Sequence, residues 1–93
     1  TKNRQFAVTE ENIIIIPMIN SPAAVTVTHA TDQQFTGLGG FGTLVYTIHV
    51  NNSSGSINGA TGLYTAGATY PVTDTVRVTD SLGNIADALV TVI

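Results

Sequence analysis

The chain has 93 residues, no cysteine and only 10% charged residues, and six acidic side chains outnumber three basic ones. Two of the basic residues, Lys2 and Arg4, lie at the N-terminus, so Arg77 is the single cation of the remaining sequence. Nucleic-acid binding and a polybasic membrane patch are both excluded by this count, because each needs several lysines or arginines near phosphate.

The N-terminal region contains four consecutive isoleucines, Ile13, Ile14, Ile15 and Ile16. Successive strand residues point to opposite faces, so this run cannot bury all four side chains in one core. We expect it to pack on a neighbouring domain or a second chain, which predicts self-association through these four residues. The apolar run ends soon after Pro17, far short of the ~20 residues of a membrane span, so no membrane insertion is expected.

Four later segments alternate apolar and polar residues with a period of two, which is typical of half-buried strands. These segments are AVTVTH at 24–29, TLVYTIHV at 43–50, TVRVT at 75–79 and ALVTVI at 88–93. In the second segment the alternation predicts one common face for Leu44, Tyr46, Ile48 and Val50. His49 is then expected on the outward face.

Turn-forming residues separate these segments at 37–40, 51–55 and 80–84. The last of these stretches, Asp80 to Asn84, has a length suited to a hairpin connection. No window has helical periodicity. Short strands punctuated in this way predict an all-β fold, a β-sandwich of about seven antiparallel strands.

The stretch SINGATGLYTAG at 56–67 is rich in glycine, as phosphate-binding loops are. A phosphate loop needs a lysine after its last glycine and a helix N-terminus, and neither is indicated here. We therefore interpret the glycines as turn residues. Asn58-Gly59 is predicted to form a tight turn because both residues tolerate positive φ, and Gly62 a second bend that returns Leu63 and Tyr64 to the core.

Most of the chain resembles a bacterial immunoglobulin-like (Big-type) domain of surface adhesins and secreted repeat proteins. The resemblance runs from about Ile15 to Ile93 and rests on Gln34-Phe35, on the GSINGATGLYTA phrase and on the closing TDSLGN. Such domains often carry a tryptophan on the central strand, where this chain has Tyr46. The resemblance implies an immunoglobulin-like domain over 15–93, preceded by an extension or linker over 1–14. It also implies export, tandem repetition with neighbouring domains of the same kind, and no catalytic residues to transfer.

No catalytic or cofactor site is predicted. His29 and His49 are the only histidines and have no zinc-site spacing, and no nucleophile-elbow motif occurs. Calcium is the one metal with candidate ligands, since carboxylate and amide oxygens cluster around the last two strands. These candidates are Asp74, Asp80, Asn84 and Asp87. The competing interpretation is that Asp80 caps its own turn through backbone N–H groups.

Two aromatic residues in loops, Phe41 and Tyr70, are candidates for contacting a sugar or a protein. The expected function is that of a structural or adhesive module, a rigid spacer or a presented binding surface, in an exported bacterial multidomain protein at the cell surface. Two alternatives stay open: a carbohydrate- or protein-binding module that uses these aromatics, and an accessory domain of a phage virion protein. None of the three implies an enzyme.

Overall fold

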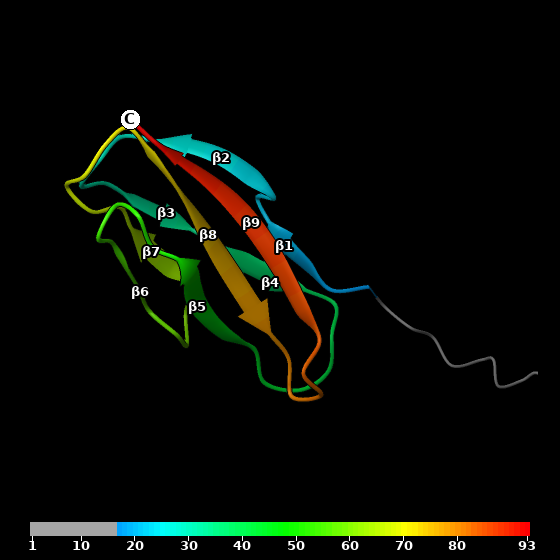
Figure 1. Ribbon diagram of the computed structural model, residues 1–93. Helices are drawn as coiled ribbons and strands as arrows, with labels where there is room; N and C mark the ends of the chain where they lie inside the picture. Colours follow the sequence, from blue (N-terminus) through cyan, green and yellow to red (C-terminus); the bar gives the residue numbers. More distant parts are fainter. Residues whose placement is uncertain (1–16) are drawn as a thin grey trace, which may run out of the picture.

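A computed structural model describes residues 17–93, which form nine short strands and no helix (Figure 1). The all-β prediction is confirmed for this part of the chain. Residues 17–93 contain no helix long and apolar enough to cross a lipid bilayer. The strands are β1 (Ile19–Ser21), β2 (Ala24–Val27), β3 (Asp32–Gln34), β4 (Thr36–Leu38), β5 (Val45–Val50), β6 (Ser56–Ile57), β7 (Leu63–Thr65), β8 (Val72–Thr79) and β9 (Ile85–Val92).

The largest sheet has four strands in the order β2-β9-β8-β5. Its centre is the antiparallel pair β8–β9, with Thr79 opposite Ile85 at the tip and Val72 opposite Val92 at the other end. The predicted hairpin at 80–84 is therefore confirmed. The alternation is confirmed too, because Val76, Val78, Ala88, Val90 and Val92 are all buried.

One strand pair departs from the predicted antiparallel arrangement. β2 runs parallel to β9, with Ala24 opposite Leu89 and Val27 opposite Val92. Parallel neighbours need a long connection between them, and here almost the entire chain separates the two strands. The alternation within each strand, which was the basis of the prediction, does not report strand direction.

The described residues contain more strands than the seven or so expected, because pairing is interrupted within two extended segments. Phe35 separates β3 from β4, and Pro22-Ala23 separate β1 from β2. The Ser21–Pro22 peptide bond is cis, as is Tyr70–Pro71. At Pro22-Ala23 the chain changes its pairing partner, since β1 pairs with β4 and β2 with β9.

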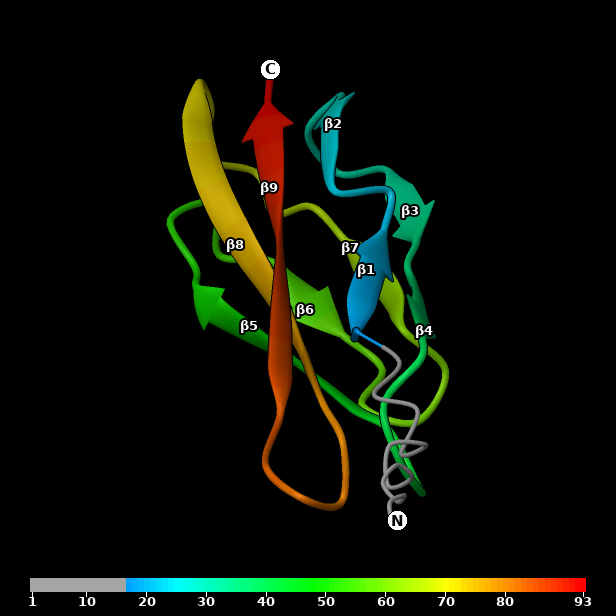
Figure 2. The same cartoon turned by 90° about the vertical axis from the view of Figure 1, so that its right-hand side faces the viewer.

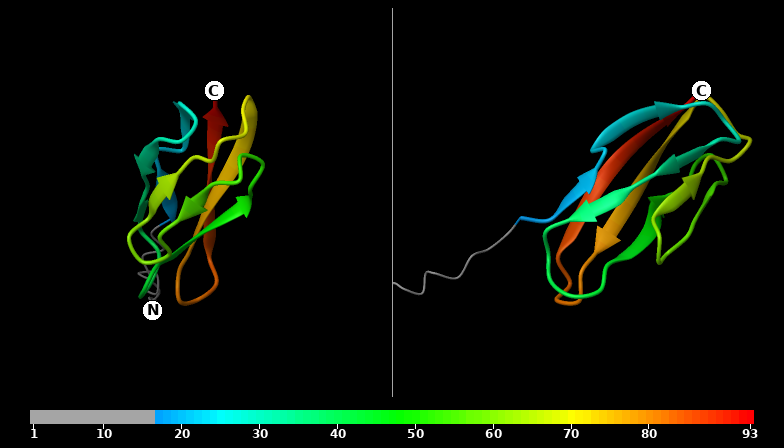
Figure 3. Two further views of the ribbon diagram at one scale, coloured as in Figure 1. Left: turned by 90° about the vertical axis from the view of Figure 1, so that its left-hand side faces the viewer. Right: turned by 180° about the vertical axis from the view of Figure 1, so that it is seen from behind.

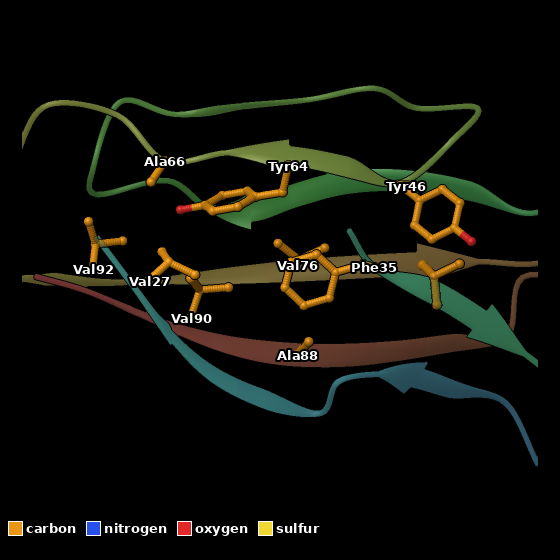
Figure 4. Packing of buried hydrophobic residues seen from close by; sticks show 10 residues of the cluster. Val27, Phe35, Tyr46, Tyr64, Ala66, Val76, Ala88, Val90 and Val92 are labelled. Carbon is orange, nitrogen blue, oxygen red and sulfur yellow. The ribbon is translucent and has the colours of Figure 1, made fainter. Parts of the chain in front are cut away.

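The sheet β3-β7-β6 forms a second layer facing the four-stranded sheet, and the two-stranded sheet β1-β4 connects the layers, with β1 beside β9 (Figures 2 and 3). The core lies between the layers, where Tyr64 and Ala66 point toward Val27, Val90 and Val92 (Figure 4). The rings of Phe35 and Tyr64 meet edge to face with centroids 6.0 Å apart. Such aromatic contacts add to the stabilisation from apolar burial, which is limited in a domain as small as this one.

The predicted common face of Leu44, Tyr46, Ile48 and Val50 holds only for the first three residues. A register shift between Ile48 and Val50 places Val50 opposite Thr75, and its side chain is exposed. A bulge of this kind adds one residue to a strand and reverses the alternation beyond it. His49 is exposed, as predicted.

The described chain begins and ends at opposite ends of the long strands (Figures 1 and 3). Met18 lies beside Gly40, close to Asp80 at the β8–β9 turn. At the other end the backbone N–H of His29 donates to the carbonyl of Ile93 at 2.7 Å. The isoleucines at 13–16 and the domain boundary predicted near residue 15 lie outside the described residues, so these two points stay predictions.

Candidate functional site

The glycine-rich stretch contains β6, β7 and the turn that connects them, as the turn interpretation predicted. Ile57 pairs with Tyr64, and the N–H of Asn58 donates to the carbonyl of Leu63. The Asn58 side chain holds the turn, because its Oδ1 accepts the N–H groups of Ala60 at 2.9 Å and Thr61 at 3.1 Å. The geometry is an asparagine-capped loop, with no helix after the last glycine.

Two details of the turn prediction are wrong. Positive φ occurs at Gly62, +79°, and at neither Asn58 nor Gly59. The connection is longer than a two-residue turn, and the chain reverses at its last residue, Gly62. Leu63 does not return to the core with Tyr64: it is 40% exposed, whereas Tyr64 is fully buried. Neighbouring strand residues face opposite layers, so only one of the two can enter the core.

Asp74 is the most buried acidic residue of the described chain, and four donors surround its carboxylate. Oδ1 accepts the backbone N–H groups of Asn52 at 2.6 Å and Ser53 at 3.0 Å. Oδ2 accepts the Ser53 hydroxyl at 2.5 Å and the Tyr64 hydroxyl at 2.6 Å. Ser53 and Asp74 have no exposed surface. A buried charge is tolerated only with such complete pairing, so this network ties the 51–55 loop to β7 and β8.

The same network shifts the pKa values of two groups. Burial of Asp74 by itself would raise the pKa of its carboxyl, but the hydrogen bonds from Ser53, Tyr64 and Asn52 outweigh burial and hold that pKa below 3.8. Burial first, and then the hydrogen bond to Asp74, raise the pKa of the Tyr64 hydroxyl to about 12. The carboxylate and the phenol therefore keep opposite protonation states over the whole physiological range.

Asp80 caps the β8–β9 turn, which was the competing interpretation to a calcium ligand. Its Oδ1 accepts the N–H groups of Leu82 at 2.9 Å and Asn84 at 2.8 Å. Its Oδ2 accepts the Asn84 amide at 2.9 Å and the N–H of Phe41 at 3.0 Å. The hydrogen bonds from Asn84 are the main cause of a lowered pKa at Asp80.

Asp87 lies on the outer surface of the four-stranded sheet and pairs with Arg77 on the neighbouring strand. The guanidinium donates from Nε to Oδ1 at 2.8 Å and from Nη2 to Oδ2 at 3.0 Å, a bidentate geometry. This pairing lowers the pKa of the Asp87 carboxyl.

The structure does not bring the four calcium candidates together. Asp74 faces the core near the start of β8, Asp80 lies in the turn at its end, and Asp87 lies on the outer face, so only Asp80 and Asn84 meet. No three histidine or acidic side chains in residues 17–93 are grouped as a metal site would require. Sequence proximity to the last two strands suggested convergence, but an eight-residue strand separates its two ends by about 25 Å.

The two candidate binding aromatics lie at opposite ends of the molecule. Phe41 is 64% exposed, and its carbonyl accepts the N–H and hydroxyl of Ser81 beside the β8–β9 turn. Tyr70 precedes β8 at the other end, is 53% exposed and stacks on His29 with ring centroids 3.8 Å apart. They cannot form one binding surface, so each would have to act alone.

Comparison with known proteins does not assign the chain to a family. No protein-family model matches the chain, and no curated protein matches it either.

Proposed function

We propose that this chain is an immunoglobulin-like sandwich module that serves as a rigid spacer in an exported bacterial multidomain protein. The two facing layers support this fold, as does the order β2-β9-β8-β5 with the sheet β3-β7-β6 opposite. Arg77 is the single basic residue beyond position 4, and side-chain hydrogen bonds hold the loops at 51–55 and 80–84. Both features favour a mechanical role over nucleic-acid binding.

The observation that carries the proposal is the parallel pairing of β2 with β9, between the two ends of the described chain. The described chain enters near Met18 and leaves at Ile93, at the other end of the molecule. Tension between these ends draws β2 and β9 in opposite directions along their length, because the two strands are parallel. Hydrogen bonds of the ladder run across this direction, so they must rupture together. The carbonyls of Ala23 and Val27, which accept from Leu89 and Ile93 at 2.9 Å, close the two ends of the ladder.

Single-molecule force spectroscopy on tandem copies of the chain tests the proposal. Loading through the two chain ends shears β2 against β9, whereas loading between an introduced Ala68→Cys and residue 93 unzips β8 from β9. The chain has no cysteine of its own, so an introduced thiol is a unique attachment point. We expect the end-to-end unfolding force to be at least about twice the unzipping force, since unzipping breaks one hydrogen bond at a time. Equal forces in the two geometries would remove the basis of the spacer proposal.

A second candidate function is recognition of a sugar or protein surface, and the exposure of Phe41 favours it. The loop backbone on either side of this ring is held by Asp80 and Ser81, so the aromatic is presented on a fixed support. A glycan array probed with the chain and with Phe41→Ala checks this function, with Tyr70→Ala as the matched change at the opposite end. Binding lost only in Phe41→Ala supports recognition at this end, and an unchanged array profile argues for a spacer alone.

A further inference from the structure

The outward side of the two central strands is a surface that nothing in residues 17–93 covers. We name it the outer β8–β9 face. On β8 the outward residues are Thr73, Thr75, Arg77 and Thr79, and on β9 they are Ile85, Asp87, Leu89 and Thr91. These residues form four cross-strand pairs, Thr73–Thr91, Thr75–Leu89, Arg77–Asp87 and Thr79–Ile85.

Four exposed apolar side chains lie on the outer side of this sheet. Leu89 is 50% exposed and Ile85 49%, on either side of the central ion pair. Val45 and Val50 on the neighbouring β5 are also exposed. Solitary exposed apolar residues are normal, but four on one sheet face with uncharged threonines between them are typical of a contact surface.

The charge pattern of the face favours a second copy of the chain as its partner. Arg77 and Asp87 sit side by side in register at its centre, and their side chains retain 25% and 39% exposure. A twofold axis that runs along the strands, midway between β8 and β9 and above the face, superposes the β9 of a second copy on β8. Arg77 then faces the Asp87 of the other copy, and Asp87 faces its Arg77. The face is thus electrostatically complementary to itself, which is the requirement for an isologous contact.

The same rotation matches the other pairs. Leu89 meets the methyl group of Thr75 from the second copy, and Ile85 meets that of Thr79, so apolar atoms meet apolar atoms. The pair Thr73–Thr91 exchanges partners as well. We propose that the outer β8–β9 face binds the same face of a second copy of this chain.

The size of the sheet fits a weak contact. The four strands contain four, six, eight and eight residues, and with a rise of about 3.3 Å per residue and a strand spacing of about 4.8 Å they give a face of roughly 400 Å² per copy. Both faces together bury on the order of 800 Å², less than a standard specific interface, so the isolated chain dimerises weakly. In an array of such modules many weak contacts act together, because each one raises the effective concentration of the next. This self-association does not depend on the spacer function, since shear resistance is a property of one copy.

Sedimentation equilibrium of the full chain over a wide concentration range tests the proposal, with two charge variants as its sharpest probe. Arg77→Glu makes the centre of the face wholly negative and Asp87→Arg makes it wholly positive. We expect the wild-type chain to dimerise, each variant alone to weaken dimerisation at least tenfold, and an equimolar mixture of the two to restore it as a heterodimer. Thermal melts of each variant establish that it is folded. Restoration in the mixture cannot arise from misfolding, because it requires two intact faces.

Three further variants locate the contact. Leu89→Ser should weaken dimerisation, whereas Leu63→Ser, a similarly exposed leucine on the opposite layer, should leave it unchanged. Ile14→Ser/Ile16→Ser addresses the isoleucine run. Dimerisation that survives both charge reversals, or that is lost in the isoleucine variant and kept in Leu89→Ser, would overturn the proposal. A chain that stays monomeric at every concentration would do so as well.

Discussion

Asp74 shows how a single carboxylate can organise a loop. Alternation along β8 directs its side chain inward together with Val76 and Val78. Charge in that position would be costly if Ser53, Asn52 and Tyr64 did not supply donors, and those donors come from two other segments of the chain. The network therefore stabilises the position of the 51–55 loop most strongly while the carboxyl is ionised.

Asp74→Asn should lower the free energy of unfolding by about 2 kcal/mol near neutral pH, because hydrogen bonds to a charged acceptor are replaced by weaker ones. The folded-state pKa of Asp74 lies below 3.8, so its contribution is present above that pH and is lost as the pH falls through the lower folded value. Urea denaturation from pH 7 to pH 2 measures both effects. The variant should lose less stability with acid than the wild type does.

Asp32→Asn is the matched control, because Asp32 is exposed and accepts one hydroxyl, that of Thr65. Its cost should stay within about 0.5 kcal/mol. An Asp74→Asn chain as stable as this control, with an unchanged acid profile, would show that the buried network contributes nothing.

The β6–β7 connection depends on Gly62 more than on the Asn58-Gly59 pair. Gly62 has a φ of +79°, and a Cβ there would meet the carbonyl oxygen of Phe35 and lie 2.9 Å from the ring of Tyr46. Gly62→Ala therefore combines backbone strain with a steric clash. Gly83 supplies a clean comparison, since its φ is +88° and nothing lies within 4 Å of its Cβ position.

Gly83→Ala should cost about 1–2 kcal/mol, the penalty of a left-handed conformation alone. Gly62→Ala should cost about 2 kcal/mol more than that, because overpacking against Phe35 and Tyr46 adds to it. Urea midpoints of the two variants measure the difference. Equal midpoints would mean that the connection moves aside without disturbing the core.

The sequence was most informative about elements whose residues alternate strictly. β8 and β9, their hairpin and the inward valines were predictable, because side-chain alternation and turn residues are local properties. The parallel direction of β2 and the bulge after Ile48 were not, since pairing between distant segments determines both. The same limit applies to the site. The phase of β8 puts Asp74 inside with Val76 and Val78 and could have indicated its burial, whereas the stacking of Tyr70 on His29 required the fold.

At the scale of the whole molecule, the two layers and the placement of the chain ends define how load would pass through it. The β2–β9 ladder lies between the incoming and outgoing chain. The β8–β9 turn lies outside this ladder, at the lower end of the molecule in Figure 2. Interactions that must break before the transition state determine unfolding under force, so two changes of equal equilibrium cost can differ in mechanical effect.

The end-to-end unfolding force of Ile93→Pro, compared with Gly83→Ala, tests the central claim most directly. Ile93→Pro removes the N–H that donates to Val27 at the upper end of the ladder, at an equilibrium cost of about 1 kcal/mol. Gly83→Ala costs about as much at the turn. If the β2–β9 ladder bears the load, Ile93→Pro lowers the unfolding force clearly and Gly83→Ala leaves it near the wild-type value. Equal decreases in both variants, or a larger one in Gly83→Ala, would contradict the claim.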